Sequence, residues 1–361
     1  MGRKKRLPLF LIFTALCLLI STGTADSQSI ARKVHEEYGT ELRRGTLVTH
    51  ADTSTSTVRD WRHAPAVPQK GFLGDVEQFV YKRTKITDGN HIGESLELSM
   101  RILFDRNAEG PRPVILCIPG GGFMSSDMDN MDFYSGYFAD HGFVAAVIEY
   151  RTIGQGRYMD GVADIRDAIR GLRAHADKYG IDPENIGLFG ASAGGHMAAL
   201  TAVAPDLDKF RGEGNLGYSH EVQAVVSLFG TSDLTRIAMD LDSETQQFHT
   251  LPQTCEAQYV NGVLSGMGIL DDPEEARLAN PITYLDGDEP PFLHMHGDED
   301  NLISPSMSLL LHEALLKHHD ISVRYSLQGE NHGSAGFFTE PALNLILAFC
   351  ERHLCRTPAA E

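Results

Sequence analysis

Residues 185–200 read NIGLFGASAGGHMAAL, and this stretch decides the fold. An apolar run ends at a serine between two glycines, and a segment with the composition of a helix follows directly. Ser192 is therefore predicted to occupy a tight strand-to-helix turn, with its hydroxyl exposed at the carboxyl end of a sheet. Gly190 and Gly194 suit this turn because a Cβ at either position would collide with neighbouring backbone. The amino terminus of the following helix favours negative charge at the same place.

A second turn is rich in glycine and also follows a buried strand. Residues 114–123 read VILCIPGGGF, an apolar run that enters three consecutive glycines. Backbone N–H groups in such a loop can point at a reacting carbonyl oxygen. We expect Gly121 and Gly122, together with Ala193 after the serine, to form an oxyanion hole, in which losing one donor costs about 3 kcal/mol.

The last part of the chain supplies an acid and a histidine after two further strands. Residues 291–300 read PFLHMHGDED, a buried strand followed by three acidic residues. Residues 322–327 alternate as a strand does, and His332 follows them. A chain order of serine, acid and histidine predicts a catalytic triad, with Asp300, Asp298 and Asp233 as the candidate acids.

Taken together, these motifs make the chain resemble the α/β-hydrolases of the hormone-sensitive-lipase-like and bacterial feruloyl/acetyl (xylan) esterase-like branch, over roughly residues 76–354. The resemblance implies that Asp300 is the triad acid, because it lies four residues past the histidine that ends the strand. Asp298 is then interpreted as shaping the turn, and Asp233 as capping a helix. The family's usual His-Gly-Gly-Gly loop is Pro-Gly-Gly-Gly here, so the fixed φ of Pro119 must supply rigidity.

The resemblance implies a function as well. We expect a serine carboxylic-ester hydrolase that forms an acyl-enzyme on Ser192 and needs no cofactor or metal. Pro-Gly-Gly-Gly followed by an aromatic is similar to the loop of some sugar-ester esterases, which favours short acyl esters such as acetylated or feruloylated carbohydrate. A serine peptidase similar to prolyl oligopeptidase is the alternative enzyme, although such enzymes typically carry an aromatic where Ala193 stands. A hydrolase-fold binding module without catalysis is the other alternative.

The strand and helix patterns predict a mostly parallel, doubly wound α/β sheet with an antiparallel amino-terminal edge. Residues 76–81 and 96–104 show strand patterns, and the second alternates as a half-buried antiparallel strand does. Continuous apolar runs from residue 114 onward indicate parallel strands that are covered on both faces. Residues 234–281 interrupt the strand-helix rhythm and are predicted to form a small cap.

Three residues that flank the catalytic loops are candidates for a substrate pocket. They are Phe123, Met124 and Phe337. The competing interpretation is that they belong to the ordinary hydrophobic core.

The first residues have the pattern of a secretory signal peptide. Four basic residues at 3–6 precede an apolar run over 7–20, and small residues precede a predicted cleavage after Ala25. We therefore expect a secreted or periplasmic protein, with an uncleaved membrane anchor as the alternative. Residues 26–75 are predicted to be an irregular amino-terminal arm, and residues 76–361 the catalytic domain.

Charge and cysteine content bound the remaining possibilities. Cleavage would shift the formal net charge from −18 to −22, which argues against nucleic acid or anionic lipid as a partner and leaves a small-molecule or carbohydrate ester.

Cys117 is predicted to be a buried free thiol. A disulfide from Cys255 to Cys350 or Cys355 stays open, because sequence does not determine connectivity. Oligomeric state is not predicted.

Overall fold

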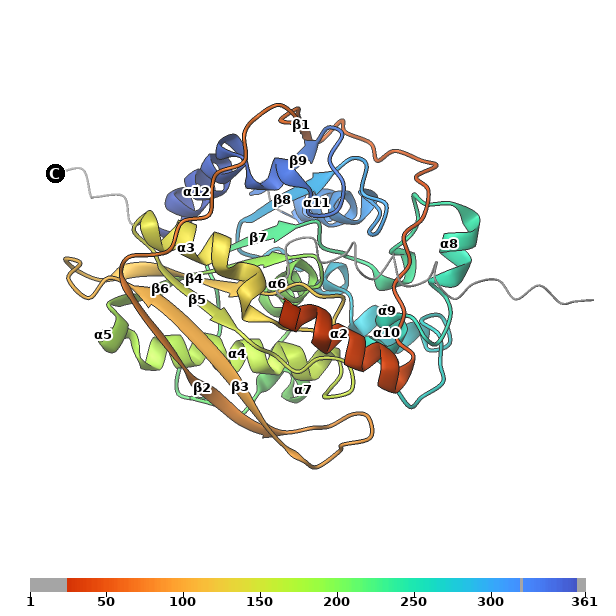
Figure 1. The fold of residues 1–361 in the computed structure, drawn as a ribbon, viewed down its shortest axis with the longest axis horizontal. Helices are drawn as coiled ribbons and strands as arrows, with labels where there is room; N and C mark the ends of the chain where they lie inside the picture. Colours follow the sequence, from red (N-terminus) through yellow and green to blue (C-terminus); the bar gives the residue numbers. More distant parts are fainter. Residues whose placement is uncertain (1–24, 319–320, 356–361) are drawn as a thin grey trace, which may run out of the picture.

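In the computed structural model, residues 25–318 and 321–355 are described, and they build one sheet with helices on both faces (Figure 1). The signal peptide predicted over residues 1–25 lies outside the described residues except for Ala25. The sheet has nine strands within the described ranges, in the order β1-β9-β8-β7-β6-β4-β5-β3-β2. The strands are β1 Thr57–Arg59, β2 Asp75–Lys85, β3 Ser95–Phe104, β4 Arg112–Ile118, β5 Val144–Ile148, β6 Ile181–Ala191, β7 Ala224–Leu228, β8 Phe292–Gly297 and β9 Ser322–Leu327.

Strand directions agree with the sequence patterns. β2 pairs with β3, and β3 with β5, in antiparallel register, with Met100 opposite Ile148. Every other neighbouring pair is parallel. The mostly parallel sheet with an antiparallel amino-terminal edge is therefore confirmed.

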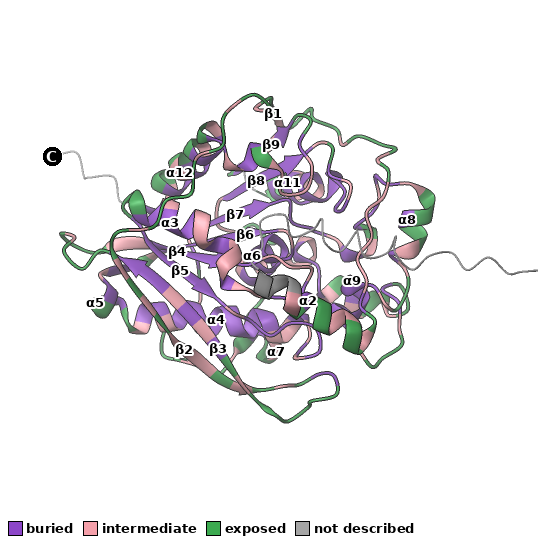
Figure 2. Ribbon diagram, in the orientation of Figure 1, coloured by how far each residue is buried: buried purple, intermediate pink, exposed green. Residues whose placement is uncertain are grey.

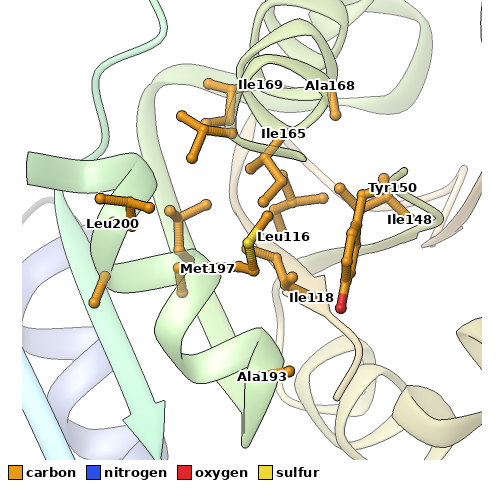
Figure 3. Close-up of a cluster of buried hydrophobic side chains, with 14 of the residues drawn as sticks. Leu116, Ile118, Ile148, Tyr150, Ile165, Ala168, Ile169, Ala193, Met197 and Leu200 are labelled. Carbon is orange, nitrogen blue, oxygen red and sulfur yellow. The ribbon is translucent and has the colours of Figure 1, made fainter. Parts of the chain in front are cut away.

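Two hydrophobic layers cover the sheet, because alternate side chains of each strand point to opposite faces. Leu116 of β4 packs into the layer beneath α4 and α6, whereas its neighbour Ile115 packs beneath α3 and α12. Figure 3 shows the first layer, in which Met197 of α6 lies close to Leu116. The central strands are buried along their length, and exposed residues lie on the outer helices and on β2 and β3 (Figure 2).

The helices connect the strands in the rhythm that the sequence predicts. Between β5 and β6 the chain forms the long helix α4 and then one turn, α5, which ends at Gly180 with φ 63°. The helices around the sheet are α3 Asp132–Asp140, α4 Tyr158–Ala174, α5 Ala176–Tyr179, α6 Ala193–Val203, α7 Asp208–Arg211, α11 Ser306–His318 and α12 Glu340–Leu354, with the 3₁₀ turns η2 Met128–Met131 and η5 Ala335–Phe338.

The segment predicted as a cap is helical and lies at one end of the sheet (Figure 1). It contains η3 Leu234–Arg236, α8 Ser243–Phe248, α9 Cys255–Asn261 and α10 Pro273–Leu278, and η4 Pro281–Tyr284 begins at its last residue. Side chains cap most of these short helices: Asp242 accepts a hydrogen bond from Thr245 N, and Thr254 accepts one from Ala257 N.

The prediction that residues 26–75 are irregular is wrong in two places. Residues 25–38 form the helix α2, Ala25–Tyr38, which lies beside α9, and Gln258 of α9 donates a hydrogen bond to the carbonyl of Tyr38 (Figure 1). β1 forms the edge of the sheet by pairing with β9. A three-residue strand carries no periodic signal of its own, and it exists because β9 offers a free edge.

The cysteines in the described residues are all free thiols. Cys117, Cys255 and Cys350 are buried, and Cys355 is exposed. The buried free thiol predicted at Cys117 is confirmed, and the open question of a disulfide is answered by its absence among these four residues.

Among the helices that the structure describes, none combines the length and the apolar character that crossing a membrane requires.

Candidate active site

Ser192 occupies the sharp turn between β6 and α6. Its backbone has φ 56° and ψ −124°, a conformation that residues other than glycine rarely adopt and that costs about 1–3 kcal/mol. A Cβ on Gly190 would lie under 3.0 Å from the carbonyl of Gly194, and a Cβ on Gly194 equally close to the carbonyl of Ile118. The flanking glycines are thus required by close backbone contacts, as the sequence indicates.

His332 connects Ser192 to Asp300. Its Nε2 lies 2.9 Å from the Ser192 hydroxyl oxygen, and its Nδ1 lies 2.7 Å from Oδ2 of Asp300. With the proton on Nδ1, the imidazole donates to the carboxylate, and Nε2 is left to accept the hydroxyl proton. The structure therefore brings Ser192 into contact with a histidine 140 residues later in the sequence, which in turn contacts an acid 32 residues before it.

Asp300 is fully buried in the loop after β8 and is held by several donors. Its Oδ1 accepts hydrogen bonds from the backbone N–H groups of Leu302 and Ile303, at 2.9 and 3.0 Å. Burial raises the pKa of the Asp300 carboxyl, but electrostatic attraction to His332 and the hydrogen bonds from His296 and His332 lower the pKa by more, so that it lies well below its usual range. The carboxyl is therefore ionised and can stabilise an imidazolium.

Sequence reasoning missed the second histidine at Asp300. His296 Nε2 lies 3.1 Å from Oδ2 of Asp300, and its Nδ1 lies 3.0 Å from the Ser308 hydroxyl. Its four-residue spacing from Asp300 was visible, but nothing in the sequence showed that the loop turns back onto its own strand. His294, two residues earlier, stacks on Phe292 in the core.

The two competing acids have structural partners of their own. Asp298 accepts a hydrogen bond from Gly329 N at 2.6 Å, which connects the turns after β8 and β9. Asp233 caps η3 by accepting from Thr235 N at 3.0 Å. Asp300 is the acid that contacts His332.

The glycine loop packs directly against the serine turn. A Cβ on Gly120 would lie 2.6 Å from the carbonyl of Ala191, and Gly121, Gly122 and Phe123 all have positive φ, at 140°, 59° and 61°. Among the described residues, none accepts a hydrogen bond from the N–H groups of Gly121, Gly122 or Ala193. These donors are therefore free to bind an oxyanion beside Ser192.

Tyr150 steadies this loop, which sequence reasoning also missed. The phenol is fully buried and donates a 2.8 Å hydrogen bond to the carbonyl of Pro119. Burial raises the pKa of Tyr150, so the donor stays protonated. The loop that lacks the family's histidine is thus held by a side chain that follows the neighbouring strand, β5, in addition to the ring of Pro119.

A small pocket opens at Ser192. It is lined by Leu42, Gly122, Phe123, Ser192, Ala193, Thr231, Ile237, Cys255, Leu302 and Ile303. Of the three predicted pocket residues, Phe123 is in this lining. Met124 and Phe337 do not line this pocket. Both are buried in the core, and Phe337 packs edge-on against Phe229, whose ring in turn lies 4.6 Å from that of His332.

The amino-terminal arm contributes to the site, which the sequence did not indicate. Leu42 is part of the pocket wall. Arg44 Nη1 donates to Asn301 Oδ1 at 2.6 Å and approaches Asn331 Oδ1 at 3.3 Å. These asparagines follow Asp300 and precede His332, so Arg44 connects the acid loop to the histidine loop.

His196, in the first turn of α6, lies in a buried position behind the serine. Its Nδ1 contacts the carbonyl of Thr231 at 3.0 Å, and its ring packs edge-on against Phe123. Burial lowers the pKa of His196 to about 4, so the ring is neutral near pH 7. Within the part of the chain that is described, no group of three or more His, Cys, Asp or Glu side chains is arranged so that it could hold a metal ion.

Known proteins resemble this chain in both sequence and structure. A family model named BD-FAE matches residues 100–315, more than half of the chain. The probable carboxylic ester hydrolase LipM of Mycobacterium tuberculosis is 29% identical over 205 residues, which cover 55% of this chain and 44% of LipM. Esterase LipC of the same organism is 28% identical over 258 residues, which cover 70% of this chain and 61% of LipC. The chain thus spans about half the length of these curated relatives.

Among solved structures, a truncated form of a carbohydrate esterase from gut microbiota has the same fold. The TM-score is 0.65 at 22% identity, and the match covers 81% of this chain and 100% of that one. A mostly parallel sheet that carries a serine turn, an acid and a histidine after its successive strands is the α/β-hydrolase fold. With this fold and a family model that spans most of the sheet, the chain belongs to the BD-FAE family.

Proposed function

We propose that this chain is a serine carboxylic-ester hydrolase that acts through an acyl-enzyme on Ser192. One observation carries the proposal: His332 lies within hydrogen-bond distance of both the Ser192 hydroxyl and the Asp300 carboxylate. The free N–H groups of the glycine loop beside the serine complete what acyl transfer requires. The named esterases among the relatives support the same reaction class.

Acylation begins at the Ser192 hydroxyl. As its oxygen attacks the ester carbonyl, Nε2 of His332 takes the proton, and Asp300 stabilises the imidazolium that results. The carbonyl oxygen becomes an oxyanion and accepts hydrogen bonds from the N–H groups of Gly121, Gly122 and Ala193. Collapse of this intermediate breaks the bond to the alcohol, which leaves with the proton from His332.

Deacylation repeats these steps with water. His332 removes a proton from a water molecule as that water attacks the acyl carbonyl, and the same N–H groups bind the second oxyanion. When the intermediate collapses, Ser192 regains its proton and the free acid leaves. In this proposal the same three side chains and the same backbone N–H groups act in both half-reactions.

Short acyl esters of carbohydrates are the substrate class that we propose. The Pro-Gly-Gly-Gly loop with a following aromatic favours them over long-chain lipids, and the pocket at Ser192 is small. The chain shares its fold with a carbohydrate esterase. A secreted or periplasmic location, proposed from the first residues, would place the protein where polymeric carbohydrate is accessible.

The test compares the purified protein with Ser192→Ala on p-nitrophenyl acetate, acetylated xylan and methyl ferulate. We expect the variant to lose at least about 10³-fold in kcat, because the nucleophile is gone. Ser54→Ala, which changes an exposed serine, is the matched control and keeps wild-type activity. Equal rates for the wild type and Ser192→Ala would contradict the proposal. A peptide p-nitroanilide tests the peptidase alternative, and preference for it over the esters would favour that reading.

A further inference from the structure

We propose that this enzyme selects acetyl esters, and that Leu42 of the amino-terminal arm sets this limit by closing the acyl pocket. The inference rests on the proposed ester hydrolysis and narrows its substrate to one acyl group. It also assigns a function to the arm, which the motifs of the catalytic domain do not suggest.

The pocket lies on the acyl side of the reacting ester. Its lining includes Ser192 and two of the proposed oxyanion donors, Gly122 and Ala193, but not His332. His332 has to reach the oxygen of the leaving alcohol in order to protonate it, so the alcohol lies on the histidine side. The acyl group, bonded to the Ser192 oxygen and held by the oxyanion donors, therefore extends into the pocket.

The pocket has room for little more than a methyl group. Its water-accessible volume is ≈ 20 Å³. A single water needs about 10–15 Å³ by the same measure, so one or two small groups fill it. Four of the lining side chains are aliphatic, namely Ile237, Leu302, Ile303 and Leu42.

Three of these four walls are built into the core and have little freedom to move. Ile237, Leu302 and Ile303 are 4%, 3% and 5% exposed, and they belong to one buried cluster with Leu241 and Met307. Leu302 and Ile303 are also held through their N–H groups by Asp300. Close-packed walls of this kind resist the insertion of additional methylenes.

Leu42 closes the remaining side from the arm. Its Cδ1 lies 2.6 Å from the position that a Cβ on Gly122 would take, so the leucine rests directly on the glycine loop. The arm is held on both sides of it, by a bridge between Glu41 and Thr254 and by the hydrogen bond from Gly45 N to Asn301 O, at 2.9 Å. Leu42 is only partly buried, and removing its side chain would open the pocket toward solvent.

The size of the expected preference follows from the chemistry of apolar pockets. One additional methylene is discriminated by about 10–200-fold when the pocket cannot enlarge. We therefore expect the wild type to cleave p-nitrophenyl acetate with a kcat/KM at least about 10-fold above the propionate ester, and further above the butyrate ester. The leaving alcohol is the same in this series, so the acyl side alone varies.

The experiment measures kcat/KM for acetate, propionate, butyrate and hexanoate esters with the full chain, with Leu42→Ala and with Leu47→Ala. Leu47 lies in the same arm and pairs with Leu241, but it does not line the pocket, which makes it the matched control. Leu42→Ala should raise the butyrate-to-acetate ratio by at least about 10-fold, whereas Leu47→Ala should keep the wild-type ratio. Leu42→Phe should lower the propionate-to-acetate ratio further.

The possible results separate the acetyl preference, the role of Leu42 and the proposed ester hydrolysis from one another. A wild type that cleaves butyrate as fast as acetate overturns the acetyl preference, while the proposed ester hydrolysis stands. The same shift in Leu42→Ala and Leu47→Ala, or none in either, overturns the role of Leu42. If no ester is cleaved faster than by Ser192→Ala, the proposed function fails and the inference fails with it.

Discussion

Single side chains at the candidate site are held by partners that are distant in the sequence. Asp300 receives hydrogen bonds from both His332 and His296, and Tyr150 holds the carbonyl that begins the glycine loop. Preorganisation of this kind matters because catalytic donors must already point at the charge that develops. The supporting side chains are therefore the natural targets for mutations that alter turnover and leave the three reacting groups in place.

Removing the Tyr150 hydroxyl should weaken the glycine loop. Tyr150→Phe leaves the buried carbonyl of Pro119 without its donor, which costs about 1–3 kcal/mol. We expect a lower free energy of unfolding in urea and a reduced kcat with a smaller change in KM. Tyr137→Phe, which removes a 3.3 Å contact with Asn344 near the surface, is the control and should alter neither quantity by much.

The guanidinium of Arg44 should act as a positioning group for the acid and histidine loops. Its hydrogen bonds to Asn301 and Asn331 are absent in Arg44→Met, and bonds from a charged donor contribute about 1.5–3 kcal/mol. We expect kcat to fall about 10-fold with KM nearly unchanged. Arg43→Met, which removes an ion pair with the exposed Glu244, is the matched control. Equal effects from the two variants would argue against a specific role for Arg44.

At the scale of the element, the feature that shapes the site is the close approach of backbone segments at the serine turn. β6, α6 and the loop after β4 approach so closely that positions 190 and 194 admit no Cβ. Ser192 has a positive φ in this turn, and Ala193 lines the same pocket as Gly122 of the glycine loop. Packing, rather than local propensity, holds the turn in this conformation, because a positive φ at serine is unfavourable by itself.

Gly194→Ala should therefore disrupt both fold and activity. The new methyl group would meet the backbone carbonyls of Ile118 and Pro119, and backbone cannot give way as the end of a side chain can. We expect a loss of stability of about 3 kcal/mol, measured by urea denaturation, and no detectable ester hydrolysis. Gly217→Ala is the matched control, since a Cβ there has no neighbour within 4 Å. Normal stability in Gly194→Ala would contradict the close approach.

For the whole molecule, several histidines are buried within the fold, and this makes stability depend on pH. Burial lowers the pKa of His196 from 6.5 to about 4 and lowers that of His294 well below 6.5. At these two positions the unfolded chain therefore binds more protons than the folded one below pH 6.5. The stability that these two neutral histidines contribute is fully present above their unfolded pKa of 6.5. It is lost as the pH falls from 6.5 toward their lower pKa values in the folded protein.

Acid titration of the free energy of unfolding tests this dependence. Between pH 6.5 and 4, His196 alone should account for a loss of about 3 kcal/mol. His196→Asn keeps a donor for the carbonyl of Thr231 and should show a shallower slope over this range. His50→Asn, at an exposed position, should keep the slope of the wild type. A slope in His196→Asn that matched the wild type would remove His196 from the explanation.

Much of the fold can be predicted from the sequence, because most of its strands have clear hydrophobic patterns. Continuous apolar runs give the parallel strands, alternation gives β3, and the spacing of Gly190, Ser192 and Gly194 gives the serine turn. These signals are local, since each depends on residues that are neighbours in the chain. The chain order of serine, acid and histidine then predicts that the three side chains meet at the carboxyl ends of the strands.

Other features have no local signal. The arm reaches the site only because β9 offers an edge to β1 and because the cap segment pairs with Glu41. The contacts of Arg44, His296 and Tyr150 likewise join segments whose meeting depends on the sheet order. Sequence alone determined the fold class and the three candidate catalytic side chains. Only the tertiary structure decided which side chains support them and how small the pocket is, because packing between distant segments sets both.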